Sequence, residues 1–191
     1  VTLTLFHKFK KALDTNSRLT WVYKNILIPG CRFLCDVESN GVPFDPDRLT
    51  TSSSLMQLQI SEAVDKLNSY PEVQRFIKDR GEFNPNSTVQ LRSLLFDYIG
   101  LEPTGKKTGT GADSTDAEVL GQLGEQHEIP KLILEVRQNV KIKNTYLDKI
   151  LQALDLDGRL RTGFNLHGTT SGRLSSSGKL NMQQIPRDNP I

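Results

Sequence analysis

Few residues in this sequence suit covalent cross-linking or metal binding. Its 191 residues include two cysteines, one tryptophan and three histidines. Cys31 and Cys35 lie four residues apart in an apolar stretch that favours a helix, where disulfide geometry is poor and a metal would lack further ligands. None of the histidines has a companion ligand nearby, so each is expected to be a surface or capping residue. We expect the cysteines to be buried, free thiols in a reducing cytosol.

Long hydrophobic runs and a strong net charge are also missing. No apolar run approaches the roughly 20 residues of a membrane span, and the first residues lack the basic region and cleavage site of a signal peptide. The chain does not begin with methionine, so we expect a processed product or a piece of something longer. The net charge of +2 means that any nucleic-acid surface must come from local arrangement. The composition suits one or two small domains with a real core.

Apolar residues recur at helical spacing over most of the chain. The periodicity predicts helices over residues 3–13 and 19–37, a third from Asp45-Pro46 down to Asn68-Ser69, then shorter ones, then a long helix from Pro130 to about Leu154. Pro29 either kinks its helix or joins two helices. Asn40-Gly41 is expected to end a helix, and Ser87–Gln90 and Thr115–Glu118 have the spacing of helix caps. Residues 159–167 alternate as a strand with one buried face would.

The stretch from 169 to 177 is poor in core-forming side chains and rich in small hydroxyl groups and glycine around one arginine. Arg173 offers a rigid fork of donors, and Asn181 and Gln183 each offer a donor and an acceptor. Minor-groove edges of a duplex present mainly acceptors, which these side chains suit at any base pair. A polar loop that binds nothing has the same composition, so both interpretations stay open on composition alone.

Two other segments carry positive charge in a pattern that suits phosphate. Lys106 and Lys107 lie in a glycine-rich loop, which favours a basic tip that touches a DNA backbone. A nucleoside-triphosphate loop is disfavoured, because Lys107 stands where a hydroxyl for Mg²⁺ is required and no strand precedes it. In the long helix, Arg137, Lys141 and Asn144 line one side at spacings of four and three. That line either follows phosphates or is a solvated face.

The C-terminal stretch resembles the signature T-x-(T/S)-G-R-L-S-S…N-(L/M)-Q-x-I-P of family-A DNA polymerases. It matches at Thr169, Ser171, Gly172, Arg173, Leu174, Ser175, Ser176, Asn181, Gln183, Ile185 and Pro186. The resemblance implies that Thr169, Arg173, Ser175, Asn181 and Gln183 contact DNA. One departure is local: residues 177–180 replace a stretch that is usually one residue shorter and contains Asp-Pro.

The resemblance extends upstream and implies an architecture. Residues 37–45 resemble the turn after the proofreading domain, residues 83–101 a thumb segment, and residues 106–115 the thumb tip. The long helix resembles L-E-x-R-x-x-x-K-x-K-x-T-Y-x-D-K, which implies that Arg137 and Lys141 contact the DNA backbone. The implied fold is mainly α: a helical thumb subdomain with long antiparallel helices, plus a small β element at the C-terminus. The implied domains are a helical connector (1–45), the thumb (46–155) and the start of the palm (156–191).

The catalytic motifs of that family are missing. Nucleotidyl transfer needs two Mg²⁺ ions held by carboxylates, which in this family lie downstream of the signature. The sequence contains no Asp-Tyr-Ser-x-x-Glu, no Arg-x-x-x-Lys helix with following aromatics and no His-Asp-Glu, and the proofreading carboxylates are also absent. We therefore predict no catalytic and no metal-binding residue here. The chain alone is expected to be inactive, and Mg²⁺ is expected only in the complete enzyme.

The implied function is to grip a primer–template DNA duplex during replication or repair. The other expected partners are the remaining palm and fingers, on the same or a second chain. No membrane is expected, and the expected location is the cytoplasm of a bacterium or a phage-infected cell. Two alternatives stay open: a stand-alone DNA-binding subunit of a split polymerase, and a helical protein–protein adaptor.

Overall fold

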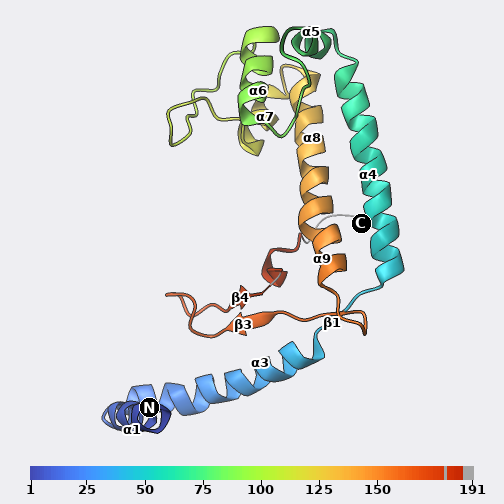
Figure 1. Ribbon diagram of the computed structural model, residues 1–191. Helices are drawn as coiled ribbons and strands as arrows, with labels where there is room; N and C mark the ends of the chain where they lie inside the picture. The colour runs from blue at the N-terminus through green and yellow to red at the C-terminus, as the bar shows by residue number, and fades with distance from the viewer. Residues whose placement is uncertain (179, 187–191) are drawn as a thin grey trace. The chain divides into compact units, whose positions relative to one another are not determined.

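The computed structural model describes residues 1–178 and 180–186. Within them the chain is mainly helical with small antiparallel β elements, which confirms the predicted fold class (Figure 1). It divides into two compact units. The first unit comprises residues 1–46 and the described residues from 149 on, and the second comprises residues 47–148. The predicted segments 1–45 and 156–191 thus fall in one unit; the three-part domain division stays a prediction.

The second unit is built from helices. In chain order they are α4 (Pro46–Asn68), α5 (Pro71–Arg80), α6 (Thr88–Arg92), the π-helical turn η2 (Ser93–Tyr98), α7 (Ala117–Leu123), α8 (Glu128–Ile142) and the π-helical turn η3 (Lys143–Leu147). The path continues directly from η3 into α9 (Asp148–Ala153). The predicted long helix is therefore present, although its middle is widened by a π turn.

The two long helical paths of this unit run antiparallel (Figure 1). Near the start of α4, Ser53 Oγ donates to Asp148 Oδ1 at 2.6 Å, at the end of η3. Near the end of α4, Lys66 Nζ lies 2.8 Å from Glu128 Oε1, at the start of α8. Between these contacts, apolar side chains from both paths pack together as a small cluster: Met56, Ile60 and Leu147. This packing and the polar contacts fix the register of the pair.

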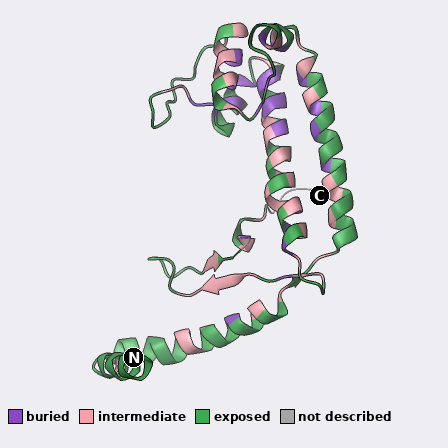
Figure 2. Cartoon of the chain, in the orientation of Figure 1, coloured by how far each residue is buried: buried purple, intermediate pink, exposed green. Residues whose placement is uncertain are grey.

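The main core of the second unit lies where α5, α6, α7 and the first half of α8 meet, as the purple residues in Figure 2 indicate. Its buried side chains are Leu67, Val73, Phe76, Phe83, Leu91, Leu94, Leu95, Val119, Leu120, Leu123, Ile129, Leu132 and Ile133. Each fully buried Leu, Val or Phe contributes about 1.5–3 kcal/mol relative to an exposed one. This core includes residues of η2 and α7, the elements on either side of the loop that carries Lys106 and Lys107.

The helix caps follow the sequence pattern only in part. Ser87 Oγ accepts from Gln90 N as predicted, at 3.4 Å, but the Gln90 side chain accepts from Asn84 N at 2.7 Å instead of from Ser87. At α7 the predicted cap is wrong. Asp116, not Thr115, caps the helix, because Asp116 Oδ1 accepts from the backbone of the third residue on at 3.0 Å.

Helix α8 begins two residues earlier than predicted. His127 is its N-cap, and His127 Nδ1 accepts from Ile129 N at 3.2 Å. This confirms a capping role for one of the three histidines. Pro130 lies inside the first turn, where its missing N–H is not needed.

The first unit starts with helices and ends with short strands. Its elements are α1 (Thr2–Asp14), α2 (Ser17–Val22), the π-helical turn η1 (Tyr23–Leu27), α3 (Ile28–Asn40), β1 (Val42–Pro43), β2 (Arg159–Leu160), β3 (Gly163–Asn165), β4 (Ser175–Ser177) and the 3₁₀ turn η4 (Met182–Gln184). Pro29 occupies the first turn of α3, so it marks the start of a helix and introduces no break within one.

The strands form two antiparallel pairs. Val42 pairs with Leu160 in one sheet, and Gly163 pairs with Ser177 in the other. The single predicted strand over 159–167 is therefore two strands in different sheets. Gly41 ends α3 with φ 61°, and a Cβ there would lie 2.9 Å from Leu160 O, so the position requires glycine.

The N-terminal helices are amphipathic as predicted, but their apolar side is exposed. Every residue of α1, α2 and η1 is exposed or half-buried, and Leu34 is the buried residue of α3. Cys31 and Cys35 are free, but both are exposed, so the expected burial is wrong. Helical spacing correctly predicted an apolar face on these helices. It could not show that no other part of the unit covers that face in the described residues. A search of the described residues finds no helix that is long and apolar enough to cross a membrane.

Candidate nucleic-acid interface

Arg173 lies on the loop between β3 and β4. Its side chain is exposed and forms no hydrogen bond or ion pair with any described residue. The loop around it is ordered by its own contacts, since Thr169 Oγ1 donates to Arg173 O at 2.6 Å. Gly172, with φ 73°, supplies the left-handed turn just before the arginine. The full set of guanidinium donors is therefore available to a ligand.

The hairpin that carries this loop is attached to α3 and to the segment after it. Glu38 Oε1, on α3, accepts from Phe164 N at 2.6 Å. Thr162 Oγ1 lies 2.8 Å from Ser177 O and 3.1 Å from Leu180 O. These bonds bring Leu180, and the amide residues that follow it, to the base of the hairpin.

The side chains of Asn181 and Gln183 make hydrogen bonds within the site and are at least partly exposed to solvent. Asn181 Oδ1 caps η4 by accepting from Gln183 N at 3.0 Å. Gln183 Nε2 donates to Leu174 O at 3.1 Å, so this amide lies beside the residue that follows Arg173. The structure thus brings Arg173 and Gln183 together, and it leaves the amino group of Asn181 free of bonds to the described residues.

Ser175 lies at the start of β4, opposite Asn165, and is half-buried. A Cβ on Gly168 would collide with its Oγ, which explains the glycine in the loop. Thr169, Arg173, Ser175, Asn181 and Gln183 therefore form one local group within the first unit. The other predicted contacts belong to the second unit.

The lysine loop, residues 105–114, is a small hairpin. Lys107 and Asp113 form a β-bridge, and Ser114 N donates to Lys106 O at 2.9 Å. Both lysines are ion-paired. Lys106 Nζ lies 2.8 Å from Asp116 Oδ2 and 2.5 Å from Glu118 Oε2, and Lys107 Nζ lies 2.6 Å from Asp113 Oδ1.

The ion pairs of this loop shift the pKa values of Asp116 and Lys106. The hydrogen bond from Lys106 holds the pKa of Asp116 at about 2, with a smaller effect from the backbone N–H of Val119. The same contact, with Glu118, raises the pKa of Lys106. Asp116 and Lys106 therefore both stay charged at neutral pH. Sequence reasoning missed these carboxylates, although acidic residues six to twelve positions after the lysines were the available signal.

Arg137 differs from the other predicted contacts because its guanidinium points into the protein. Its Nε donates to Pro85 O at 2.7 Å, and its Nη1 donates to Thr115 O at 2.9 Å. Its Nη2 is buried without a partner among the described residues, and burial lowers the pKa of the group. Lys141 and Asn144, one and two turns further on, are exposed and make no hydrogen bond to any described residue.

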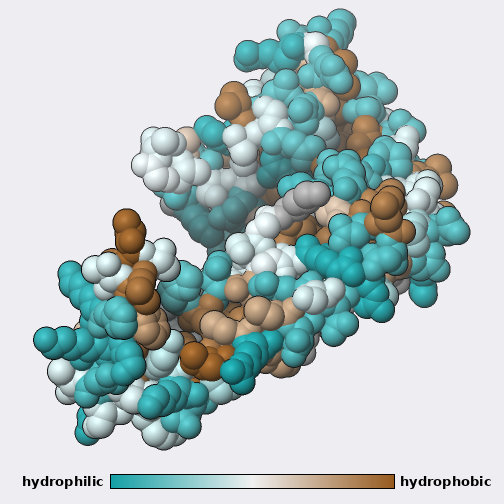
Figure 3. Space-filling model, turned by 60° about the horizontal axis from the view of Figure 1, so that its bottom comes forward, coloured by the Kyte–Doolittle hydropathy of each residue, from teal (hydrophilic) through white to brown (hydrophobic). Residues whose placement is uncertain are grey.

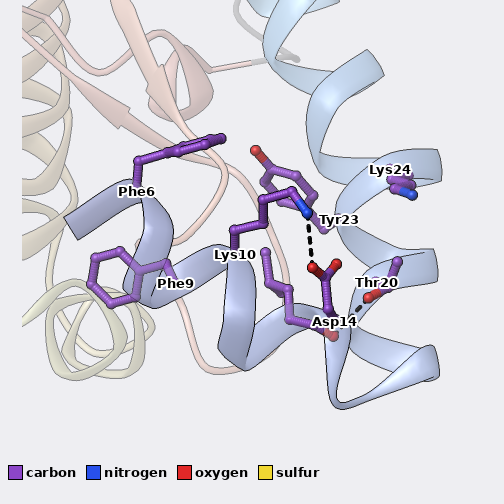
Figure 4. Close-up of a pocket in the computed structure, with 8 residues that line it drawn as sticks. Phe6, Phe9, Lys10, Asp14, Thr20, Tyr23 and Lys24 are labelled. Atoms are coloured by element: carbon purple, nitrogen blue, oxygen red, sulfur yellow. Dashed lines mark hydrogen bonds and ion pairs between the residues drawn. The ribbon is translucent and has the colours of Figure 1, made fainter. Parts of the chain in front are cut away.

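A separate apolar surface lies on the N-terminal helices. Phe9, Trp21 and Phe33 are 59–64% exposed, and hydrophobic residues (brown) reach the surface among hydrophilic ones in Figure 3. A cavity of about 510 Å³ opens between α1 and the start of η1. Figure 4 shows Phe6 and Tyr23 at its wall, beside the ion pair of Lys10 with Asp14, whose atoms are 2.8 Å apart. None of the predicted DNA contacts lines this cavity.

The comparisons with known proteins cover nearly the whole chain. Residues 52–190 match the family described as DNA polymerase family A. The chain is 52% identical over 191 residues to the DNA polymerase of Escherichia phage T5, and 37% identical over 188 residues to the thermostable DNA polymerase I of Thermus aquaticus. It covers 100% and 98% of its own length in these matches but 22% of each relative, so it spans about a fifth of their length.

A solved structure gives the same result. It is the POL domain of Pol1 from M. smegmatis in complex with DNA primer-template and dNTP, which matches with a TM-score of 0.82 at 30% sequence identity. The match covers 98% of this chain and 31% of that one. The family match over residues 52–190 and the two kinds of similarity agree, so this chain belongs to DNA polymerase family A.

Proposed function

We propose that this chain grips a primer–template DNA duplex for a family-A DNA polymerase. The observation that carries the proposal is the exposed guanidinium of Arg173, which makes no hydrogen bond or ion pair with the described residues and sits on a loop ordered by Thr169 and Gln183. A preformed donor fork with small neighbours suits the acceptors in a minor groove. Asn181 and Gln183 add amide groups, and Ser175 and Thr169 add hydroxyl groups.

The backbone contacts in this proposal come from the second unit. Lys141 and Asn144 are exposed on successive turns and suit phosphates along one strand. Lys106 and Lys107 add charge from the hairpin loop. Arg137 contributes mainly by holding that loop, since two of its donor atoms already bind backbone carbonyls. Contacts of this kind bind DNA of any sequence.

No step of nucleotidyl transfer is assigned to these residues. Among residues 1–178 and 180–186, no group of three His, Cys, Asp or Glu side chains could hold a metal ion. In this proposal the Mg²⁺ ions of the reaction are held by carboxylates elsewhere in the complete polymerase, which acts in replication or repair. We place that enzyme in the cytoplasm of a bacterium or a phage-infected cell.

The apolar surface of α1, α2 and α3 supports a second partner. The large apolar side chains of Phe9, Trp21 and Phe33 are each exposed. The relatives are about five times as long as this chain, so the proposed occupant is the rest of the polymerase, including palm and fingers. Whether that part is on the same chain or on a second chain of a split polymerase is decided by the reading frame downstream.

The test is a titration of a fluorescent primer–template duplex with this 191-residue chain at about 50 and 200 mM salt. With about three phosphate contacts by lysine, the affinity should fall about fortyfold between the two conditions. Weak binding that does not change with salt would instead favour a protein–protein adaptor, the alternative that leaves Arg173 without a role.

A further inference from the structure

The ammonium group of Lys106, on the lysine loop, is paired with carboxylates of the protein itself. Lys106 is paired with two carboxylates, of Asp116 and Glu118, at 2.8 and 2.5 Å. All three side chains are close to half exposed or more, so a ligand can reach the ammonium group. An ammonium group can donate to a carboxylate or to a phosphate oxygen, and both bonds are charge-assisted.

The contacts of the loop allow Lys106 to change partner without unfolding. The hairpin is closed by backbone bonds, such as the one from Ser114 N to Lys106 O at 2.9 Å, which do not involve the ammonium group. Asp116 uses one oxygen, Oδ1, to cap α7 and the other, Oδ2, to bind Lys106. The cap therefore remains when the lysine leaves.

We propose that Asp116 and Glu118 are internal competitors of DNA phosphate for Lys106, and that they lower the affinity of this loop for a duplex. The proposal rests on the proposed function, because it requires that Lys106 binds DNA. Binding then exchanges a carboxylate for a phosphate, so the net number of counterions released is smaller than for a free lysine. The hydrogen bond from Lys106 lowers the pKa of Asp116 to about 2, so this competitor is charged at neutral pH.

The experiment compares duplex affinity in the wild-type chain and in the double variant Asp116→Asn/Glu118→Gln. Asparagine keeps the capping oxygen, so α7 should remain folded, and circular dichroism checks this. Exposed ion pairs are weak, so the double variant should bind a primer–template duplex about two- to tenfold more tightly. Its salt dependence should be steeper by up to about one unit in the slope of log K against log salt.

A matched control separates competition from a general change in charge. Glu62→Gln/Glu125→Gln removes two exposed carboxylates of the same unit, neither of which pairs with Lys106 or Lys107. The affinity of this control variant for the duplex should rise less than about twofold, since salt screens the interaction between DNA and exposed charges that do not contact it. In a Lys106→Met background, Asp116→Asn/Glu118→Gln should give no gain.

Each outcome bears on one of the two proposals. An equal gain in the control pair, a gain that persists with Lys106→Met, or an unchanged affinity would overturn the competition. If the wild-type chain shows no salt-dependent binding and Lys106→Met has no effect, then the proposed function itself fails.

Discussion

Arg137 and Thr115 are joined by a hydrogen bond from Nη1 to the carbonyl oxygen, at 2.9 Å, across 22 residues of sequence. A second bond from the same guanidinium reaches Pro85 O at 2.7 Å. Thr115 directly precedes Asp116, which caps α7 and binds Lys106. Arg137 therefore connects the middle of α8 to the base of the lysine loop. We expect its substitution to lower mainly the free energy of unfolding.

Arg137→Ala should lower the free energy of unfolding by about 2–4 kcal/mol, because it leaves two buried backbone carbonyls without donors. Urea denaturation followed by circular dichroism measures this. Lys141→Ala is the control, since an exposed lysine without partners in the described chain should change stability by less than about 0.5 kcal/mol. Equal stability of the two variants would mean that the Arg137 bonds contribute nothing.

Asp148 should make stability depend on pH in the acid range. The hydrogen bond from Lys143 lowers the pKa of Asp148 below its usual 3.8, and the hydrogen bond from Ser53 adds a smaller effect in the same direction. A carboxyl whose pKa is lower in the folded state stabilises it above the unfolded pKa, and that stability is lost as the pH falls through the folded value. The difference in stability between wild type and Asp148→Asn should therefore be constant from pH 7 to about 5 and shrink below about 4. A difference between wild type and Asp148→Asn that stays constant down to about pH 2 would contradict the assignment.

Lys141→Ala should weaken duplex binding equally for any DNA sequence. A phosphate contact carries no sequence information, and its loss should flatten the salt dependence by about one unit. Anisotropy titrations with two unrelated duplexes at several salt concentrations measure both effects. Lys78→Ala, another exposed lysine of the second unit, is the matched control. A loss of affinity confined to one of the two duplexes would rule out a phosphate contact.

The helices were predictable because their signals are local. The apolar spacing of residues 3–13 gives α1 nearly to the residue, and Pro29 and Gly41 mark the two ends of α3. Strand β1 was not predicted, because two residues carry no periodicity and the strand exists only through its pairing with β2. The same holds for the division of the stretch 159–167 between two sheets.

The side-chain partners were less predictable than the elements. The spacing of Thr115 and Glu118 predicted the wrong cap, since Asp116 caps α7, and no sequence pattern indicated that Thr115 O accepts from Arg137, 22 residues away. Helical spacing placed Arg137 in line with Lys141, but the carbonyls of two loops turn its guanidinium inward. Likewise, the pairing of Lys106 with Asp116 and Glu118 depends on a hairpin that the sequence suggested only as a glycine-rich loop. By contrast, Arg173 was found from composition and motif, and it is exposed.

The most direct test of the account is the affinity of Arg173→Ala for a primer–template duplex, measured beside Arg18→Ala. Both variants remove an exposed arginine from the first unit and change the net charge equally. A groove contact by a rigid donor fork predicts that Arg173→Ala binds about tenfold more weakly or worse, with Arg173→Lys between it and the wild type. Arg18→Ala should change the affinity by less than about twofold. Equal, small losses in the two variants would contradict a role for Arg173 in the groove.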